Sequence, residues 1–170
     1  FMPIVQEIKR LKPDVIFSTV VGDGTAFLYQ AYADMGLDPK VMPIASLTTC
    51  EAEIAAMGHD VGEGHITAAP YFQGVQNTLN TSFVERYQKR YGANTPTNMC
   101  LEASYFQVNV FARTLERANS LETPMLRAMV MGSEFDAPQG NVSINPVWGH
   151  ADLWSRIGRA NRAGQFDILF

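Results

Sequence analysis

The sequence predicts an α/β fold, an open parallel sheet flanked by helices with a C-terminal β-hairpin, and three observations lead to it. Short β-branched and apolar runs alternate with segments whose apolar residues recur at helical spacing. The chain has 170 residues and 46% hydrophobic content, enough for one domain with its own core. Its last segment carries two strand-like runs separated by a short turn that contains glycine. We therefore expect residues 1–170 to form a single domain.

The first half is predicted to contain three strand–helix units, preceded by a helix. The predicted strands are VIFSTVV at 15–21, PIASL at 43–47 and HITAAPYF at 65–72. The segments between them recover the helical period and stop at Gly36 and Met57. Pro70 fits the end of the third strand because proline cannot donate to a central ladder. Strands joined by helices run parallel, so we expect their carboxyl ends to share one edge of the sheet.

Capping patterns predict where two helices begin. The segment TTCE at 48–51 has the form of a capping box, in which Thr48 caps the helix and Glu51 reaches back. The S-x-x-E pattern at 82–85 predicts a second helix start, and Gly92 is its C-terminal stop.

The second half is predicted to hold two more helices and the remaining strands. A long helix is expected from Met99 to Ala118, and Thr123-Pro124 opens the next because proline is tolerated in the first helical turn. The strand candidates are NVSINPVW, LWSRIGRA and QFDILF, the last two joined as a hairpin by the turn NRAG.

Composition and motif spacing argue against several classes of function. The net charge of −4 comes from dispersed acids and bases, which does not favour a nucleic-acid partner. The longest uncharged stretch, 64–84, is rich in Gln and Asn, so no membrane-inserted segment is expected. The three histidines and two cysteines have no metal-ligand spacing, and no nucleophile elbow is present. We therefore expect no metal, no cofactor and no catalytic residue.

Three loops at the strand ends are predicted to converge into a recognition site for a small ligand. Glycine allows close backbone approach, helix-start N–H groups and hydroxyls offer hydrogen bonds, and a tyrosine would supply an amphipathic wall. The candidate ligand-binding residues are Val21, Gly22, Asp23, Thr25, Thr48, Thr49 and Tyr71. Helix capping alone is the competing interpretation for Asp23, Thr48 and Thr49, since such residues commonly cap helices.

Two features of these loops leave other interpretations open. GDG at 22–24 could be a phosphate-binding turn of a nucleotide-binding domain or enzyme, but the third fingerprint glycine and the ribose-binding acid are missing. Cys50, near a helix start, could have a lowered pKa, although a small buried residue is the simpler interpretation.

The order of motifs resembles the second half of type I periplasmic binding proteins of the branched-chain amino acid, amide and urea class. The resemblance rests on PDVIFSTVVGDGTAFLYQAYADMG, MPIASLTTCEAEIAAMG, GHITAAPYF, FVERYQKRYG and FDAPQGNVSI, followed by the GQF hairpin. Within that class the motifs STVVGDGT, ASLTTCEAE, APYF and DAPQG are most similar to those of the amide sensors that regulate aliphatic amidase expression.

The resemblance implies a two-lobed protein whose lobes, joined by three crossovers, close on a small solute. This chain would be one ligand-binding lobe, a fragment lacking the N-terminal lobe. The expected ligand is a short amide or urea, with a branched-chain amino acid as the alternative. The chain is expected to be periplasmic with an ABC permease as partner if it is a transport receptor, or cytoplasmic with a regulatory protein as partner if it is an amidase regulator. Because the long helix is apolar on more than one side, we also expect self-association, as a homodimer or by domain swapping.

Overall fold

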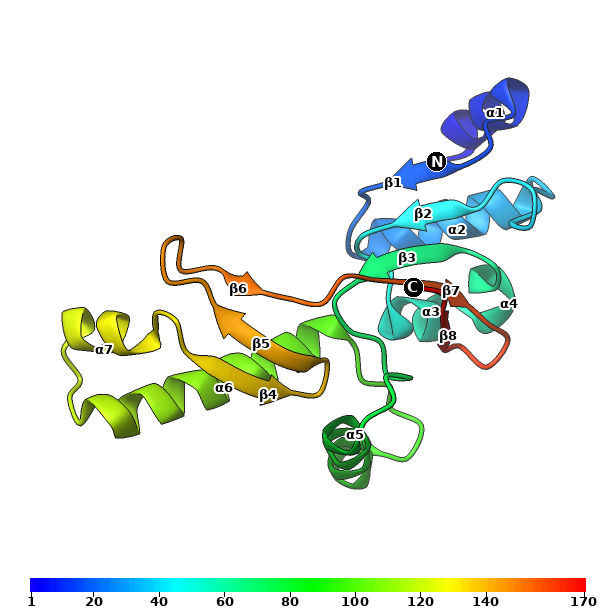
Figure 1. The fold of residues 1–170 in the computed structure, drawn as a ribbon. Helices are drawn as coiled ribbons and strands as arrows, with labels where there is room; N and C mark the ends of the chain where they lie inside the picture. Colours follow the sequence, from blue (N-terminus) through cyan, green and yellow to red (C-terminus); the bar gives the residue numbers. More distant parts are fainter.

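The computed structural model describes all of residues 1–170, which form two regions that we call the body and the arm (Figure 1). The body comprises α1 (Met2–Leu11), β1 (Ile16–Ser18), α2 (Asp23–Asp34), β2 (Ile44–Ser46), α3 (Glu51–Met57), α4 (His59–Gly62), β3 (Ile66–Ala69), α5 (Thr78–Tyr91), β7 (Arg156–Ala160) and β8 (Phe166–Ile168). The arm comprises α6 (Met99–Ala118), α7 (Thr123–Val130), β4 (Glu134–Ala137), β5 (Gly140–Ile144) and β6 (Ala151–Asp152).

The body is built on a five-stranded sheet in the order β1-β2-β3-β7-β8. β1 pairs with β2 and β2 pairs with β3, both in parallel, with Ile16 opposite Ile44 and Ser46 opposite Thr67. The expected arrangement of three neighbouring parallel strands is therefore confirmed. β7 and β8 form the predicted antiparallel hairpin, and β7 also pairs antiparallel with β3. The strand ends thus share one edge, as the alternation of strands and helices predicts.

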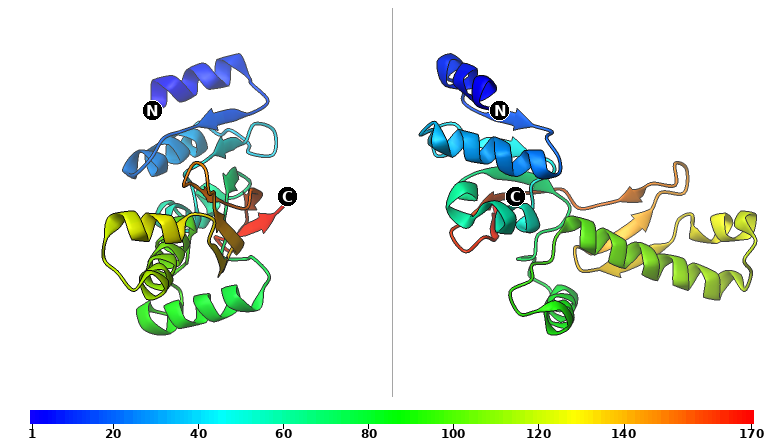
Figure 2. Two further views of the ribbon diagram at one scale, coloured as in Figure 1. Left: turned by 60° about the vertical axis from the view of Figure 1, so that its left-hand side comes forward. Right: turned by 180° about the vertical axis from the view of Figure 1, so that it is seen from behind.

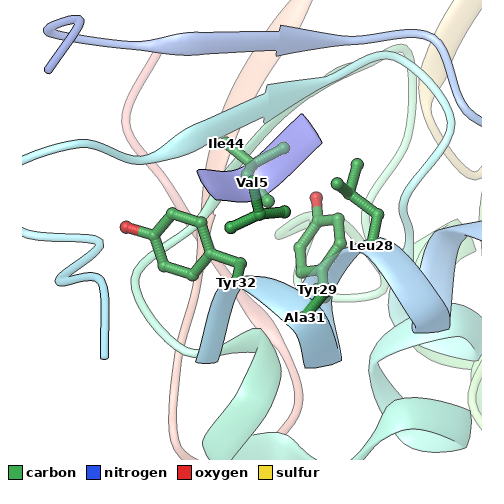
Figure 3. Packing of buried hydrophobic residues seen from close by; sticks show 6 residues of the cluster. All are labelled: Val5, Leu28, Tyr29, Ala31, Tyr32 and Ile44. Atoms are coloured by element: carbon green, nitrogen blue, oxygen red, sulfur yellow. The ribbon is translucent and has the colours of Figure 1, made fainter. Parts of the chain in front are cut away.

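The core of the body lies between the sheet and the helices on one of its faces. Val5 of α1, Tyr29 and Tyr32 of α2 and Ile44 of β2 pack together and are buried (Figure 3). His65 joins this core, because its Nδ1 accepts from the Ile44 backbone N–H at 2.9 Å and its ring lies edge-on to both tyrosines. Burial lowers the pKa of His65 to about 4, so the imidazole is neutral at pH 7. His65 is therefore a core histidine with a hydrogen-bond partner.

The arm projects from the carboxyl-end edge of the sheet (Figure 2). Its three-stranded sheet, β4-β5-β6, packs on α6 through a cluster of Phe106, Val110, Phe135, Ala137 and Val142. Helix α7 buries none of its residues. α6 spans the predicted residues and α7 begins at Thr123 as predicted, whereas β4 was not predicted. β4 is short, and it is recognised only by its pairing with β5.

Both predicted capping boxes are wrong in position. The N-cap of α3 is Cys50, and Glu53 rather than Glu51 closes the box by accepting from the Cys50 N–H at 2.9 Å. Helix α5 begins one turn before Ser82, because Asn77 caps it by accepting from the Asn80 N–H at 2.7 Å. Asn77 caps as well as serine does, so the S-x-x-E spacing alone did not single out the start of α5. At α3 the Thr48 hydroxyl donates to the Val20 carbonyl in another loop, and Cys50 takes the cap position.

Candidate functional site

The loops that follow β1 and β2 lie side by side at the carboxyl-end edge of the sheet. We call residues 19–24 and 47–49 the rim. The Thr48 hydroxyl donates to the Val20 carbonyl at 2.8 Å, which joins the two loops directly, and the buried Thr25 hydroxyl donates to the same carbonyl at 3.2 Å. The convergence of these two loops is thus a feature of the structure.

Side-chain hydroxyls fix the shape of the rim from below. Ser46 Oγ accepts from the backbone N–H groups of Thr48 and Thr49 at 3.0 and 3.1 Å. The Thr49 hydroxyl donates to Ser46 at 3.0 Å and accepts from Tyr29 at 3.1 Å, and Thr67 donates to the Thr49 carbonyl at 2.7 Å. Thr25 and Thr49 are therefore occupied in positioning the loops.

Ser46, Thr67 and Tyr29 were not among the predicted site residues. Their signal in the sequence is a hydroxyl residue on the buried face of an otherwise apolar strand or helix, where it needs a partner.

The exposed part of the rim offers unused hydrogen-bond donors. The backbone N–H groups of Val21, Gly22, Asp23 and Gly24 donate to no protein acceptor. Gly22, with φ of 64°, is the N-cap of α2 and has no side chain to satisfy them. Val21 is 66% exposed and Leu47 is 47% exposed beside these donors. The first turn of a helix with free N–H groups binds an oxygen atom of a ligand well.

Asp23 is the single charged side chain on this part of the chain, and it is exposed. It does not cap α2, because Gly22 occupies the cap position and Asp23 is the first residue of the helix. The rim therefore combines N–H donors and a carboxylate acceptor next to apolar surface, an arrangement suited to recognising a small molecule that has both an acceptor and a donor.

Tyr71, predicted as a wall of the site, lies inside the protein. It has no exposed surface, its hydroxyl donates to Asn80 Oδ1 at 2.8 Å, and it lies 2.8 Å from Thr97 Oγ1. Its ring packs edge-on to Phe83. Tyr71 thus anchors the segment that leads from α5 to α6, and it is not an exposed part of the rim.

Two ionisable groups near the start of α3 are buried. Burial raises the pKa of Cys50, whose thiol also donates to Glu53 at 2.7 Å, so the expectation of a lowered pKa is wrong and the buried interpretation is confirmed. Glu51 accepts from the Gln73 N–H at 2.6 Å, and burial raises its pKa to about 7. No cluster of His, Cys, Asp or Glu side chains has a geometry that could hold a metal ion. None of the helices combines the length and apolarity needed to cross a bilayer.

Residues 1–170 match a family model described as "Periplasmic binding protein domain". Solved structures share the fold at low sequence identity. A solute-binding protein of an ABC transporter from Rhodopseudomonas palustris BisB5, in complex with 3,4-dihydroxybenzoic acid, superposes with a TM-score of 0.85 and 23% identity over 94% of this chain and 44% of that one. A leucine-binding protein from Thermotoga maritima MSB8 gives a TM-score of 0.81 and 19% identity over 100% of this chain and 47% of that one.

A third solute-binding protein, from R. palustris in complex with 4-hydroxybenzoate, has a TM-score of 0.83 and 24% identity over 99% of this chain and 46% of that one. Among curated sequences, a protein named limonene hydroxylase from Geobacillus stearothermophilus is 29% identical over 114 residues, 67% of this chain and 21% of that protein. The chain therefore spans less than half the length of these relatives.

Proposed function

This chain belongs to the periplasmic binding protein domain family, and on that premise we propose that it is one lobe of a two-lobed receptor that captures a small solute at the rim. The observation that carries the proposal is the row of unbonded N–H groups at 21–24, exposed beside Asp23 at the carboxyl-end edge of the sheet. Open α/β sheets bind their ligands at this edge.

The second lobe is part of the proposal, and two features support it. The chain spans 44% to 47% of the length of the solute-binding proteins that share its fold. The arm leaves apolar side chains such as Phe111 and Trp148 exposed, 55% and 76% respectively, as expected of a surface that another lobe covers. A solute held between two lobes contacts both only when they are closed, so binding shifts the population toward the closed state.

For the solute we propose a short amide or urea. Its carbonyl oxygen would accept from the free N–H groups of the α2 start, and its NH₂ group would donate to Asp23 or to the Thr48 oxygen. The absence of a basic side chain at 19–24 and 47–49 favours a neutral ligand over a carboxylate, which Asp23 would repel.

A small carboxylate is the second candidate, because free N–H groups at a helix start also suit an anion. The structural relatives from R. palustris are in complex with aromatic acids, and the T. maritima relative is a leucine-binding protein. With either solute, we propose a non-enzymatic role in the periplasm with an ABC permease as partner; a cytoplasmic amidase regulator is the alternative for an amide ligand. A nucleotide has little support, because the middle residue of GDG is Asp23, whose carboxylate would repel phosphate.

Calorimetry on protein expressed from the complete reading frame tests the proposal. Acetamide, urea, leucine and 4-hydroxybenzoate are titrated separately, and we expect heat of binding with an amide or urea. Asp23→Asn removes the charge of the acceptor and Thr48→Val removes the hydroxyl. Each should weaken binding by about 5-fold to 160-fold, since a weakened or lost partner in a buried complex costs about 1–3 kcal/mol. Asp14→Asn, an exposed acid at the opposite edge of the sheet, is the matched control and should leave affinity unchanged.

Each other outcome corrects a specific part of the proposal. Binding of leucine or the benzoate alone would replace the amide by a carboxylate. Variants that lose thermal stability but keep full affinity would show that Asp23 and Thr48 are structural. Binding of ATP in place of all four solutes would overturn the receptor function.

A further inference from the structure

The connection between body and arm is narrow. The chain passes between them at residues 92–98 and 153–155. A small apolar cluster around Tyr71, Val75 and Phe83 packs on the first turns of α6 through Met99 and Leu101. The longer part of the arm, including α7 and β6, extends away from the body (Figures 1 and 2). The orientation of the arm therefore depends on a few contacts at its base.

Arg156 makes two of these contacts at once. Its Nη1 donates to the Pro70 carbonyl at 2.6 Å, and its Nη2 donates to the Gln139 carbonyl at 2.7 Å. Pro70 directly follows β3 in the body, whereas Gln139 lies in the tight turn between β4 and β5 of the arm. A planar guanidinium holds two acceptors in a fixed relation, which a flexible ammonium cannot do. The Arg156 guanidinium also stacks over Trp154, 5.4 Å from the ring centroid.

The arm side of this contact is itself held rigidly. Gln139 is fully buried, and its N–H and side-chain Nε2 donate to the two carboxylate oxygens of Glu102 at 3.3 and 2.7 Å. Glu102 lies in the first turn of α6 and is fully buried as well. The preceding carbonyl, that of Pro138, accepts from Asn77 of the body at 2.9 Å. The turn at 138–140 therefore moves together with α6. A movement of the arm would shift the Gln139 carbonyl that Arg156 holds.

We propose that Arg156 is a positioning residue that sets the angle between the arm and the strand ends, through its paired bonds to the Pro70 and Gln139 carbonyls. The inference rests on the proposed function, because this angle matters for binding only if the solute is held between two lobes. Arg156 lies outside the rim and does not touch the solute. Its removal widens the range of angles, so less of the free protein has the orientation that binds the solute.

The test measures the angle directly. In protein from the complete reading frame with Cys100→Ser, spin labels are placed through Gln30→Cys on α2 and Glu116→Cys on α6, and the distance distribution is recorded by pulsed electron resonance. We expect Arg156→Ala to broaden the distribution in the ligand-free protein and to raise Kd about 5-fold to 10-fold, with saturating solute restoring the narrow distribution. Arg156→Lys keeps the charge without the planar fork and should give an intermediate width.

Arg159→Ala is the matched control, since Arg159 is exposed on the same strand. It should change neither the width nor Kd. An Arg156→Ala protein with an unchanged distance distribution overturns the proposal, even if its melting temperature falls. A control that broadens the distribution equally overturns it too. The distance distribution of the ligand-free protein is measured without any solute. If the wild type bound no solute, the proposed function would be wrong, and the distance distributions would still decide the positioning role of Arg156.

Discussion

The body and the arm differ in the size of their buried cores, although both expose large apolar side chains such as Phe27 and Phe111. In the body, two apolar clusters lie between the sheet and its helices, and hydroxyl bonds between neighbouring loops fix the rim. In the arm, five buried apolar side chains form the centre of a single core, and α7 contributes only partly buried side chains such as Val130. An apolar groove of about 640 Å³ opens between α6 and α7, lined by Phe106, Val110 and Leu126 among others. The body therefore has the larger buried core, and the arm keeps an open apolar groove beside a small one.

This difference shows that two helices of one chain can bury very different shares of their residues. The helical pattern of α6 is as regular as that of α2, yet α2 buries five residues in 12 and α6 buries four in 20. A local pattern forms the helix, but the available neighbours decide how much of its apolar face leaves water.

The largest expected effect compares a core residue of the body with an apolar residue of the arm. Ile54 is fully buried, so Ile54→Ala should lower the free energy of unfolding by about 2–5 kcal/mol, because it leaves a cavity. Phe111 is 55% exposed, so Phe111→Ala should change it by no more than about 0.5 kcal/mol. Urea unfolding of this chain measures both. Equal losses would show that the arm is covered in solution.

The next effect is a pH dependence that arises in the body. The folded-state pKa of Glu51, about 7, lies above its ordinary value of 4.5, so its contribution to stability is complete below pH 4.5 and is lost as pH rises through 7. Glu51→Gln removes this loss and should be more stable than the wild type at pH 8 by up to about 3 kcal/mol, with no advantage at pH 4. Glu116→Gln, at an exposed position of α6, should show no such pH dependence. A pH-independent difference for Glu51→Gln would contradict the assignment.

A smaller loss of stability is expected when a buried hydroxyl is removed. The loss should be greater for a hydroxyl that bonds two elements than for one that bonds within a single helix. Thr49→Val removes the acceptor of the buried Tyr29 hydroxyl and should cost about 1–3 kcal/mol. In the arm, buried Thr114 donates only to the Val110 carbonyl one turn earlier, so Thr114→Val should cost less than about 1 kcal/mol. Thermal unfolding compares the two variants. Similar costs would mean that the hydroxyl network does not hold the rim together.

The smallest effect on stability is expected from substitutions that change the self-association of the chain. We expect this chain alone to form dimers or larger species at high concentration, because the arm exposes Phe111, Leu121 and Trp148. Phe111→Ser should shift light-scattering mass toward the monomer with little change in melting temperature, while Phe27→Ser on the body should not. A monomeric wild type at all concentrations would contradict this expectation.

The local features of the body followed from sequence because they depend on short-range physics. Three apolar runs separated by helical segments predict parallel strands with a shared edge, and Pro70 marks the end of the third. The long helix predicted over about 99–118 spans Met99–Ala118, and Asn98 and Asn119 bound it in the structure. Where a contact distant in the chain takes up the expected cap, as the Val20 carbonyl takes up the Thr48 hydroxyl, the prediction failed.

What the sequence alone determined was the fold class, the order of most elements and the position of the rim loops, because periodicity and chain connectivity decide these. Only the tertiary structure decided which side chains face solvent there. Val21, Gly22 and Asp23 remain exposed, while Thr25, Thr49 and Tyr71 turn inward. Thr49 and Tyr71 bond to Tyr29 and Thr97, which lie 20 and 26 positions away. The bonds of Arg156 likewise join residues separated by 17 and 86 positions. Such contacts arise because folding brings distant segments together, so the spacing of residues along the chain does not predict them.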